Sequence, residues 1–295
     1  MIELQNDVYR LVIEPAIGAS VRRLDVKAGG DWRPLWYPAS DMLSDLGDVA
    51  CYVLAPYSNR IRDGRFTYGG QSYELCHAEL HAIHGTVRNR ACRVVEQTKT
   101  TCKLRIVSSA SADIDFPFPF VVDIEYRIRG DRFGIELALR NTGSSAMPAG
   151  AGFHPYFART LVDPDERCTL SFISTGVYPT EDLPIPTGAA QPVPAELDFA
   201  EAREIDMHLD HCFAGWDGRA TISWPGSNVT ATIEASSSCG HIVAYSPLGE
   251  PFFAFEPVTH ASDAVNLATR GIAGHGLVDL APGQQLDLAM TIDIG

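Results

Sequence analysis

Two short aromatic segments place a histidine and a glutamate where their side chains could move protons. The chain around His154 reads GFHPYF, and an extended conformation puts His154 and Tyr156 on one face, beside Gly152, with apolar side chains on the other. Glu256 ends the aromatic run PFFAFE, where burial would raise its pKa and make it a better proton acceptor near neutral pH. The pair could supply a general acid and a general base. The alternatives are a structural histidine in the core and an edge-strand glutamate in a salt bridge.

Three further polar residues are of types that bind hydroxyl groups. Asn59 and Arg60 are adjacent and suit hydroxyl recognition, although an exposed arginine is the common alternative. Asp210 stands at an expected turn, where its carboxylate could accept hydrogen bonds from a polyol or could instead support the turn itself.

Three histidines have a spacing that would bind a metal if they lay on a helix. His77, His81 and His84 recur at i, i+4 and i+7, but a hairpin pattern precedes them and Gly85 follows His84. We therefore expect no metal here. A loop that presents the single imidazole of His84, with Gly85 allowing a close backbone approach, is the preferred interpretation.

A group of arginines surrounds these segments and leaves two interpretations open. They could form a phosphate-binding patch, or they could be solvated charges of edge strands, which is the interpretation we prefer. The residues are Arg62, Arg65, Arg88, Arg90 and Arg93.

The elements that must position these residues are mostly strands. Alternating apolar and polar residues predict strands over residues 4–13, 21–26, 66–68, 71–73, 102–108, 121–129, 133–140, 220–224, 229–235, 242–245 and 286–294. Gly69-Gly70 and Gly130-Asp131 predict hairpin turns. Because Pro155 has no N–H to donate, it places the His154 segment at a strand end or sheet edge.

Helical signals are confined to two short segments, over residues 41–52 and 200–206. Strands and helices do not alternate, which excludes a Rossmann or TIM-barrel fold. The proline-rich stretch 179–198 is interpreted as a surface excursion rather than a linker, since similar strand patterns flank it. We predict one all-β domain over residues 1–295, a large antiparallel β-sandwich with a few short helices.

Composition and charge exclude several classes of function. The chain has 295 residues and a net charge of −14, which disfavours nucleic acid and anionic membranes as partners. The N-terminus does not resemble a signal peptide, and no apolar run approaches the ~20 residues of a membrane helix. Seven cysteines without a CxxC pair fit free thiols in a reducing compartment. We expect a cytoplasmic protein that is a monomer or a weak homodimer.

Taken in order, these segments resemble the aldose 1-epimerase, or galactose mutarotase-like, family. The resemblance covers most of the chain and rests on Asn59-Arg60-Ile61 with Gly64 and Phe66, on His84-Gly85, on Phe153-His154-Pro155-Tyr156-Phe157, on Asp210 with Phe213, and on Glu256-Pro257. No single motif is specific, but the ordered set is. Three departures place the chain outside the galactose-type branch. Pro-Val-Thr-His follows Glu256 where galactose-type members usually have Thr-Gln, Thr-Val-Arg rather than a second glycine follows His84-Gly85, and Cys92 stands where relatives often carry a tryptophan.

The resemblance implies a large supersandwich that binds a free sugar on a concave face. It implies interconversion of the α and β anomers of an aldose without a metal or an organic cofactor. Glu256 would be the general base that removes the proton of the C1 hydroxyl, and His154 the general acid that protonates the ring oxygen. His84 would hydrogen-bond around the ring oxygen and the C1 hydroxyl. The remaining substrate-binding residues would be Arg60, Asp210, Asn59 and Tyr156.

Three other functions stay open on the sequence. The stretch 87–90 also resembles relatives that act on hexose 6-phosphates, which would make the substrate a phosphosugar. A non-catalytic sugar-binding β-sandwich would keep Arg60 and Asp210 without needing both His154 and Glu256. A metal-dependent sugar isomerase would use the three spaced histidines and would lose activity on chelation.

Overall fold

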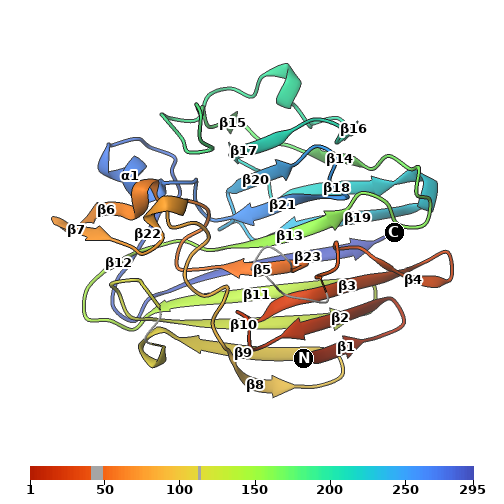
Figure 1. Ribbon diagram of the computed structural model, residues 1–295, viewed down its shortest axis with the longest axis horizontal. Coiled ribbons are helices and arrows are strands. Elements are labelled where there is room, and N and C mark those ends of the chain that lie inside the picture. Colours follow the sequence, from red (N-terminus) through yellow and green to blue (C-terminus); the bar gives the residue numbers. More distant parts are fainter. Residues whose placement is uncertain (41–48, 112–113) are drawn as a thin grey trace.

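The computed structural model describes residues 1–40, 49–111 and 114–295, which form two large antiparallel sheets stacked on each other (Figure 1). The ten-stranded sheet carries β4 (Asp31–Pro34) beside β3. Its other strands, in spatial order, are β1 (Ile2–Gln5), β2 (Tyr9–Glu14), β3 (Ser20–Ala28), β5 (Cys51–Leu54), β13 (Gly152–Ala158), β21 (Phe252–Val258), β20 (His241–Ser246), β17 (Leu209–Ala214) and β15 (Gly176–Val177).

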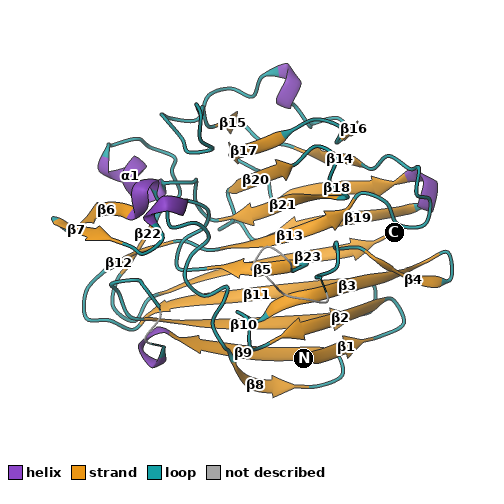
Figure 2. Cartoon of the chain, viewed as in Figure 1, coloured by secondary structure: helices purple, strands orange, loops and turns teal. Residues whose placement is uncertain are grey.

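The nine-stranded sheet lies against it and is also antiparallel throughout. In spatial order its strands are β16 (Arg203–Glu204), β14 (Thr169–Phe172), β18 (Arg219–Trp224), β19 (Val229–Ala235), β23 (Gln285–Ile294), β11 (Arg132–Asn141), β10 (Phe120–Arg129), β9 (Thr101–Val107) and β8 (Arg93–Gln97). The turn at Gly130 joins β10 to β11 as the sequence predicts. The expected all-β sandwich is confirmed (Figure 2).

Side chains from the two sheets meet in one hydrophobic core. In β2 every second residue is buried, which is the period-two pattern of a half-buried strand. Phe133 of β11 packs edge-on against Trp36 with ring centroids 5.3 Å apart, and Trp36 contacts Phe157 of β13 at 6.3 Å. These rings connect the nine-stranded sheet to the strand that carries His154, and so hold that strand from beneath.

Two small sheets and one short helix lie at one end of the sandwich. The hairpin of β6 (Arg65–Tyr68) and β7 (Gln71–Glu74) turns at Gly69-Gly70 as predicted. β12 (Met147–Ala149) pairs with β22 (Val278–Leu280), and α1 (Ala264–Thr269) packs on β6. The stretch 179–198 is a surface excursion between β15 and β16. None of the helices that the structure describes is long and apolar enough to cross a membrane.

Several expected elements are corrected by the structure. The strand over 4–13 is two strands, because Asn6 turns the chain and its Oδ1 accepts from the backbone N–H groups of Val8 and Tyr9. Residues 41–48 of the first expected helix lie outside the described residues, and its last two, Cys51 and Tyr52, are in β5. The helix over 200–206 is absent, since Arg203 and Glu204 instead pair with β14. α1 was not predicted.

Candidate active site

His154 and Glu256 meet on neighbouring strands in the middle of the ten-stranded sheet. β13 pairs with β21 so that Gly152 faces Val258 and Tyr156 faces Ala254, a register that places His154 opposite Glu256. The Nε2 of His154 lies 3.2 Å from Oε1 of Glu256. Both side chains are almost fully buried, at 3% and 1% exposure. The alternating pattern predicted for residues 152–157 is confirmed, with the imidazole on one face and phenylalanines in the core on the other.

The expected place of Pro155 at a sheet edge is wrong. β13 lies between β5 and β21, and Pro155 faces Cys51 of β5. The strand tolerates a residue without an N–H because the ladder is interrupted beside the facing pair of His154 and Glu256. Gly152 is required at the other end of this segment, since a Cβ there would lie 2.6 Å from Cγ1 of Val258. Local sequence rules therefore gave the correct face and the wrong position in the sheet.

His84 reaches the same place from a loop and completes a cluster of rings. Its backbone N–H donates to the carbonyl of Asn59 at 2.8 Å, and its ring stands perpendicular to that of His154 with centroids 5.0 Å apart. Tyr52 stacks on the His154 ring at 4.5 Å. Gly85 allows the close approach that the sequence suggested, because a Cβ there would lie 2.3 Å from the carbonyl oxygen of Ala55. Tyr52 was missed because it fell within an expected helix.

The expected hydroxyl-binding residues line one pocket together with this cluster. Asn59, Arg60 and Tyr156 are there, and so is Asp210, although Asp210 lies within β17 rather than at a turn. Asp210 pairs in register with Tyr245 of β20. The structure thus brings together all seven residues that the sequence singled out for the site, His84, His154, Glu256, Asn59, Arg60, Asp210 and Tyr156.

The pocket has a volume of about 300 Å³, which is at the small end of the range for ligand sites and suits one monosaccharide-sized molecule. Ile83, Val243 and Tyr245 complete its lining and were not predicted. Val243 and Tyr245 are two residues apart on a correctly predicted strand, so strand alternation could have placed them on one face. They give the pocket an apolar and aromatic wall beside its charged groups.

None of the five arginines that could form a phosphate patch lines this pocket. Arg65 forms an ion pair with Glu74 in the β6–β7 hairpin, and Arg93 lies on β8 of the other sheet. The guanidinium of Arg88 lies over the ring of Tyr52, 5.6 Å from its centroid. Among the described residues that line the pocket, Arg60 is the single arginine.

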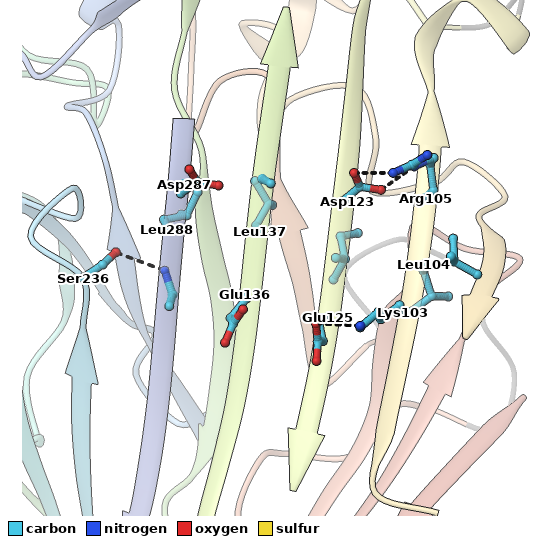
Figure 3. A pocket seen from close by; sticks show the side chains of 14 residues that line it. Lys103, Leu104, Arg105, Asp123, Glu125, Glu136, Leu137, Ser236, Asp287 and Leu288 are labelled. Atoms are coloured by element: carbon cyan, nitrogen blue, oxygen red, sulfur yellow. Dashed lines mark hydrogen bonds and ion pairs between the residues drawn. The ribbon is translucent and has the colours of Figure 1, made fainter. Parts of the chain in front are cut away.

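A larger groove of about 510 Å³ lies on the outer face of the nine-stranded sheet (Figure 3). Both of its cations are paired, since Arg105 pairs with Asp123 and Lys103 lies 3.7 Å from Glu125, and Glu136 and Asp287 add two further carboxylates. It contains no histidine and no buried carboxylate among its described residues. The groove is therefore larger than the pocket but lacks groups tuned for proton transfer.

Potential metal ligands converge in the pocket rather than along the histidine-spaced segment. His77 is exposed and contacts Glu79, and the Nδ1 of His81 accepts from the N–H of Asp63. The ligand atoms of His84, His154 and Glu256 lie within 4.8 Å of one another, and two imidazoles with a carboxylate are a donor set that divalent metals accept. Chelation is therefore an informative control for any activity of this site.

Burial shifts the protonation of the central pair in opposite directions. It raises the pKa of Glu256 well above its usual value, an effect that Asp210 increases and Arg60 reduces. It lowers the pKa of His154 to about 3. Oε2 of Glu256 is buried without a hydrogen-bond partner among the described residues, which further disfavours the charged carboxylate. The two groups therefore hold one proton between them near neutral pH, and such a pair contains one acid and one base.

These shifts predict a flat pH profile for catalysis by this pair. Below pH about 3, His154 gains a second proton and the pair loses its base, whereas above the raised pKa of Glu256 it loses its only proton. We expect kcat/KM, corrected for the spontaneous reaction, to be constant from pH 5 to 7. Rates of anomer exchange measured across this range check the prediction. A fall of kcat/KM on the acid side with a midpoint near pH ~6.5, the pKa of an unperturbed histidine, would contradict it.

Comparisons with known proteins identify the family of the chain. The model of the family described as aldose 1-epimerase matches residues 1–293. The uncharacterized protein YphB of Escherichia coli K12 is 24% identical over 269 residues, 84% of each chain. The uncharacterized protein YihR of the same organism is 27% identical over 223 residues, 72% of this chain and 71% of that one. The structure of a GalM/aldose epimerase homologue from C. elegans has a TM-score of 0.84 and 18% identity, covering 100% of this chain and 98% of the other.

Proposed function

The chain belongs to the aldose 1-epimerase family, distant from its galactose-type branch, and we propose that it interconverts the α and β anomers of a free aldose. The observation that carries the proposal is the buried contact of 3.2 Å between His154 and Glu256 at the base of a monosaccharide-sized pocket. Mutarotation needs two proton transfers and one bond rotation. A pair with one shared proton supplies the acid and the base that these transfers require.

Ring opening starts after the shared proton has moved from Glu256 to His154 across their contact. Glu256 is then ionised and His154 is protonated. Glu256 removes the proton of the C1 hydroxyl while His154 gives its proton to the ring oxygen, so that the C1–O5 bond breaks and C1 becomes an aldehyde. The aldehyde rotates about the C1–C2 bond. The O5 hydroxyl then attacks the other face of C1, returns its proton to His154, and the new C1 hydroxyl takes the proton from Glu256.

The other pocket residues hold the sugar during this rotation. His84 is neutral, because burial and the nearby His154 and Arg88 keep its pKa well below the usual value, and so one ring nitrogen donates and the other accepts. Arg60 donates to hydroxyls, and Asp210 accepts from them. Tyr156 contacts the His154 ring at 4.5 Å and closes the pocket beside it.

The charges of the pocket favour a free sugar over a phosphosugar. Asp210 lines it together with the single guanidinium of Arg60, and Glu256 must become ionised there during the proposed reaction. A phosphate on the sugar would bring roughly two negative charges toward Asp210 and would oppose that ionisation. The buried pair also favours an enzyme over a sugar-binding protein, since recognition of hydroxyls alone does not require an ionisable carboxyl group in a dry site.

The cysteines support a reducing compartment for this reaction. All seven are free thiols in the structure, and five of them are buried. A cytoplasmic location, as the sequence suggested, is compatible with that chemistry.

The test is relaxation of freshly dissolved sugars toward anomeric equilibrium, followed by polarimetry with EDTA present. We expect acceleration over buffer with at least one of glucose, galactose, arabinose, fucose and rhamnose, and the same rate without EDTA, because the proposed steps use only side chains. Glucose 6-phosphate, which equilibrates quickly unaided, is followed by NMR exchange.

Loss of the acceleration on chelation would point to a metal at His84, His154 and Glu256. Acceleration of glucose 6-phosphate alone would contradict the preference for a free sugar. Sugar binding without acceleration of any anomerisation would favour the non-catalytic alternative.

A further inference from the structure

The segment that follows β21 carries His260 into a buried, tightly packed position. His260 is 2% exposed. Gly150 makes room for its ring, since a Cβ there would lie 1.6 Å from Cδ2 of His260, and Gly276 makes room for the backbone beside it, since a Cβ there would lie 2.4 Å from the carbonyl oxygen of Thr259 and 2.9 Å from Cα of His260. His260 was not among the candidate site residues, and it does not line the pocket. Its ring is closely packed against Gly150.

The hydrogen bonds of His260 fix its tautomer. Its Nε2 accepts from the backbone N–H of Ser58 at 3.1 Å, and its Nδ1 lies 2.6 Å from the carbonyl oxygen of Ala261. An acceptor at Nε2 requires that the proton be on Nδ1, which then donates to that carbonyl. The ring is therefore neutral, and burial keeps it so by lowering its pKa to about 4. His260 thus holds the backbone N–H of Ser58, the residue directly before Asn59 and Arg60, which line the pocket.

Asn59 follows Ser58 in a conformation that needs support. Its φ of +50° is in the left-handed region, which non-glycine residues seldom adopt. Its Oδ1 accepts from Oγ of Ser262 at 3.1 Å and from Nη1 of Arg60 at 3.3 Å. Because both partners are donors, the oxygen of the amide must point to them. The NH2 group of Asn59 is left for other acceptors.

The same segment also holds Arg60 and, through Asn59, His84. The N–H of Asp263 donates to the carbonyl of Arg60 at 2.7 Å. The carbonyl of Asn59 accepts from the N–H of His84 at 2.8 Å. The segment that follows the strand of Glu256 therefore fixes the loop that carries Asn59 and Arg60, the residues expected to bind hydroxyl groups.

We propose that His260 and Ser262 are positioning residues, which hold the loop of Ser58 to Arg60 so that Asn59 presents its NH2 donors, and Arg60 its guanidinium, to the sugar. This inference rests on the proposed function and deepens it. The two residues touch the loop and not the sugar or the His154–Glu256 pair. Their loss therefore weakens binding of the sugar and leaves proton transfer in the bound complex intact.

The experiment compares Ser262→Ala with Ser108→Ala as a matched control. Ser108 is also a buried serine, but its Oγ accepts from the N–H of Phe120 beside the nine-stranded sheet. We expect Ser262→Ala to raise KM by about tenfold, the equivalent of one positioned hydrogen bond, with kcat within about twofold. Ser108→Ala should leave both constants unchanged. Thermal melting of each variant checks that it is folded.

Variants of His260 give a second readout. His260→Gln keeps a side-chain acceptor and donor, and we expect it to retain part of the affinity that His260→Ala loses. Equal KM values for Ser262→Ala and Ser108→Ala, or a fall in kcat at unchanged KM, would overturn the inference.

The same variants are titrated with each sugar by NMR to give Kd. A wild type that binds a sugar without turnover would overturn the proposed function, and the positioning role would then be decided by Kd. A wild type that binds none of the sugars would overturn both.

Discussion

Glu256→Gln will lower kcat by about 10²- to 10⁴-fold while the sugar still binds. The amide keeps the size of the side chain, but it can neither take the proton of the C1 hydroxyl nor share a proton with Nε2 of His154, 3.2 Å away. Because the replaced group is 1% exposed and its pKa is raised by burial, the substitution also removes a group that is costly to ionise in the folded protein. We therefore expect the melting temperature to stay equal or to rise.

The measurement is the rate of anomer exchange by NMR at saturating sugar, beside a melting curve for each protein. Glu250→Gln is the matched control, since Glu250 is an exposed glutamate in the turn that leads into the same strand. It should retain the wild-type rate. Near-wild-type turnover in Glu256→Gln would remove this residue from the mechanism.

His154→Ala is expected to cause a loss of the same size for a different reason. The ring oxygen of the sugar then lacks its proton donor, and the facing Glu256 loses its only partner among the described residues. The substitution also leaves a cavity beside Tyr52 and Tyr156, whose ring centroids each lie 4.5 Å from that of His154. Free imidazole has the shape and chemistry to enter this cavity.

We therefore expect added imidazole to restore part of the activity of His154→Ala and to leave Glu256→Gln unchanged. A fold check by melting accompanies the rates, because truncating a buried ring is destabilising. His77→Ala, which removes an exposed imidazole, is the control. Since an acid and a base that act as a unit are not additive, the double variant should be little slower than either single one. A double variant slower by the product of both effects would mean that the two residues act independently.

The positions of the candidate site residues could be predicted from sequence where alternation and composition act together. GFHPYF and PFFAFE each place bulky rings on one face and one ionisable group on the other, so that the core decides where the polar face points. The raised pKa of Glu256 followed from the same aromatic neighbours and is confirmed. The hairpins at Gly69-Gly70 and Gly130-Asp131 are set by local turn residues and were also correct.

What could not be predicted depends on partners distant in the sequence. Asp210 was assigned to a turn because neighbouring residues suit one, but its pairing with Tyr245 of β20 makes it part of a strand. Pro155 was placed at an edge, and only the position of β5 and β21 on its two sides shows that it is central. The role proposed for His260 could not be predicted, because the residues packed against it include Gly150 and Gly276, each in a separate part of the chain.

The order of strands in the ten-stranded sheet also decides when the candidate site can form. β13 lies between Cys51–Leu54 of β5 and Phe252–Val258 of β21, so its partners come from opposite ends of the chain. Such distant pairings must overcome loop-closure entropy before they gain contact energy, which makes folding slow. The residues proposed as the acid, the base and the hydroxyl-binding groups meet only when these three strands have assembled. On the proposed function, a chain still being synthesised has no activity until β21 has emerged and folded, and turnover that returns after denaturation reports completion of the central sheet.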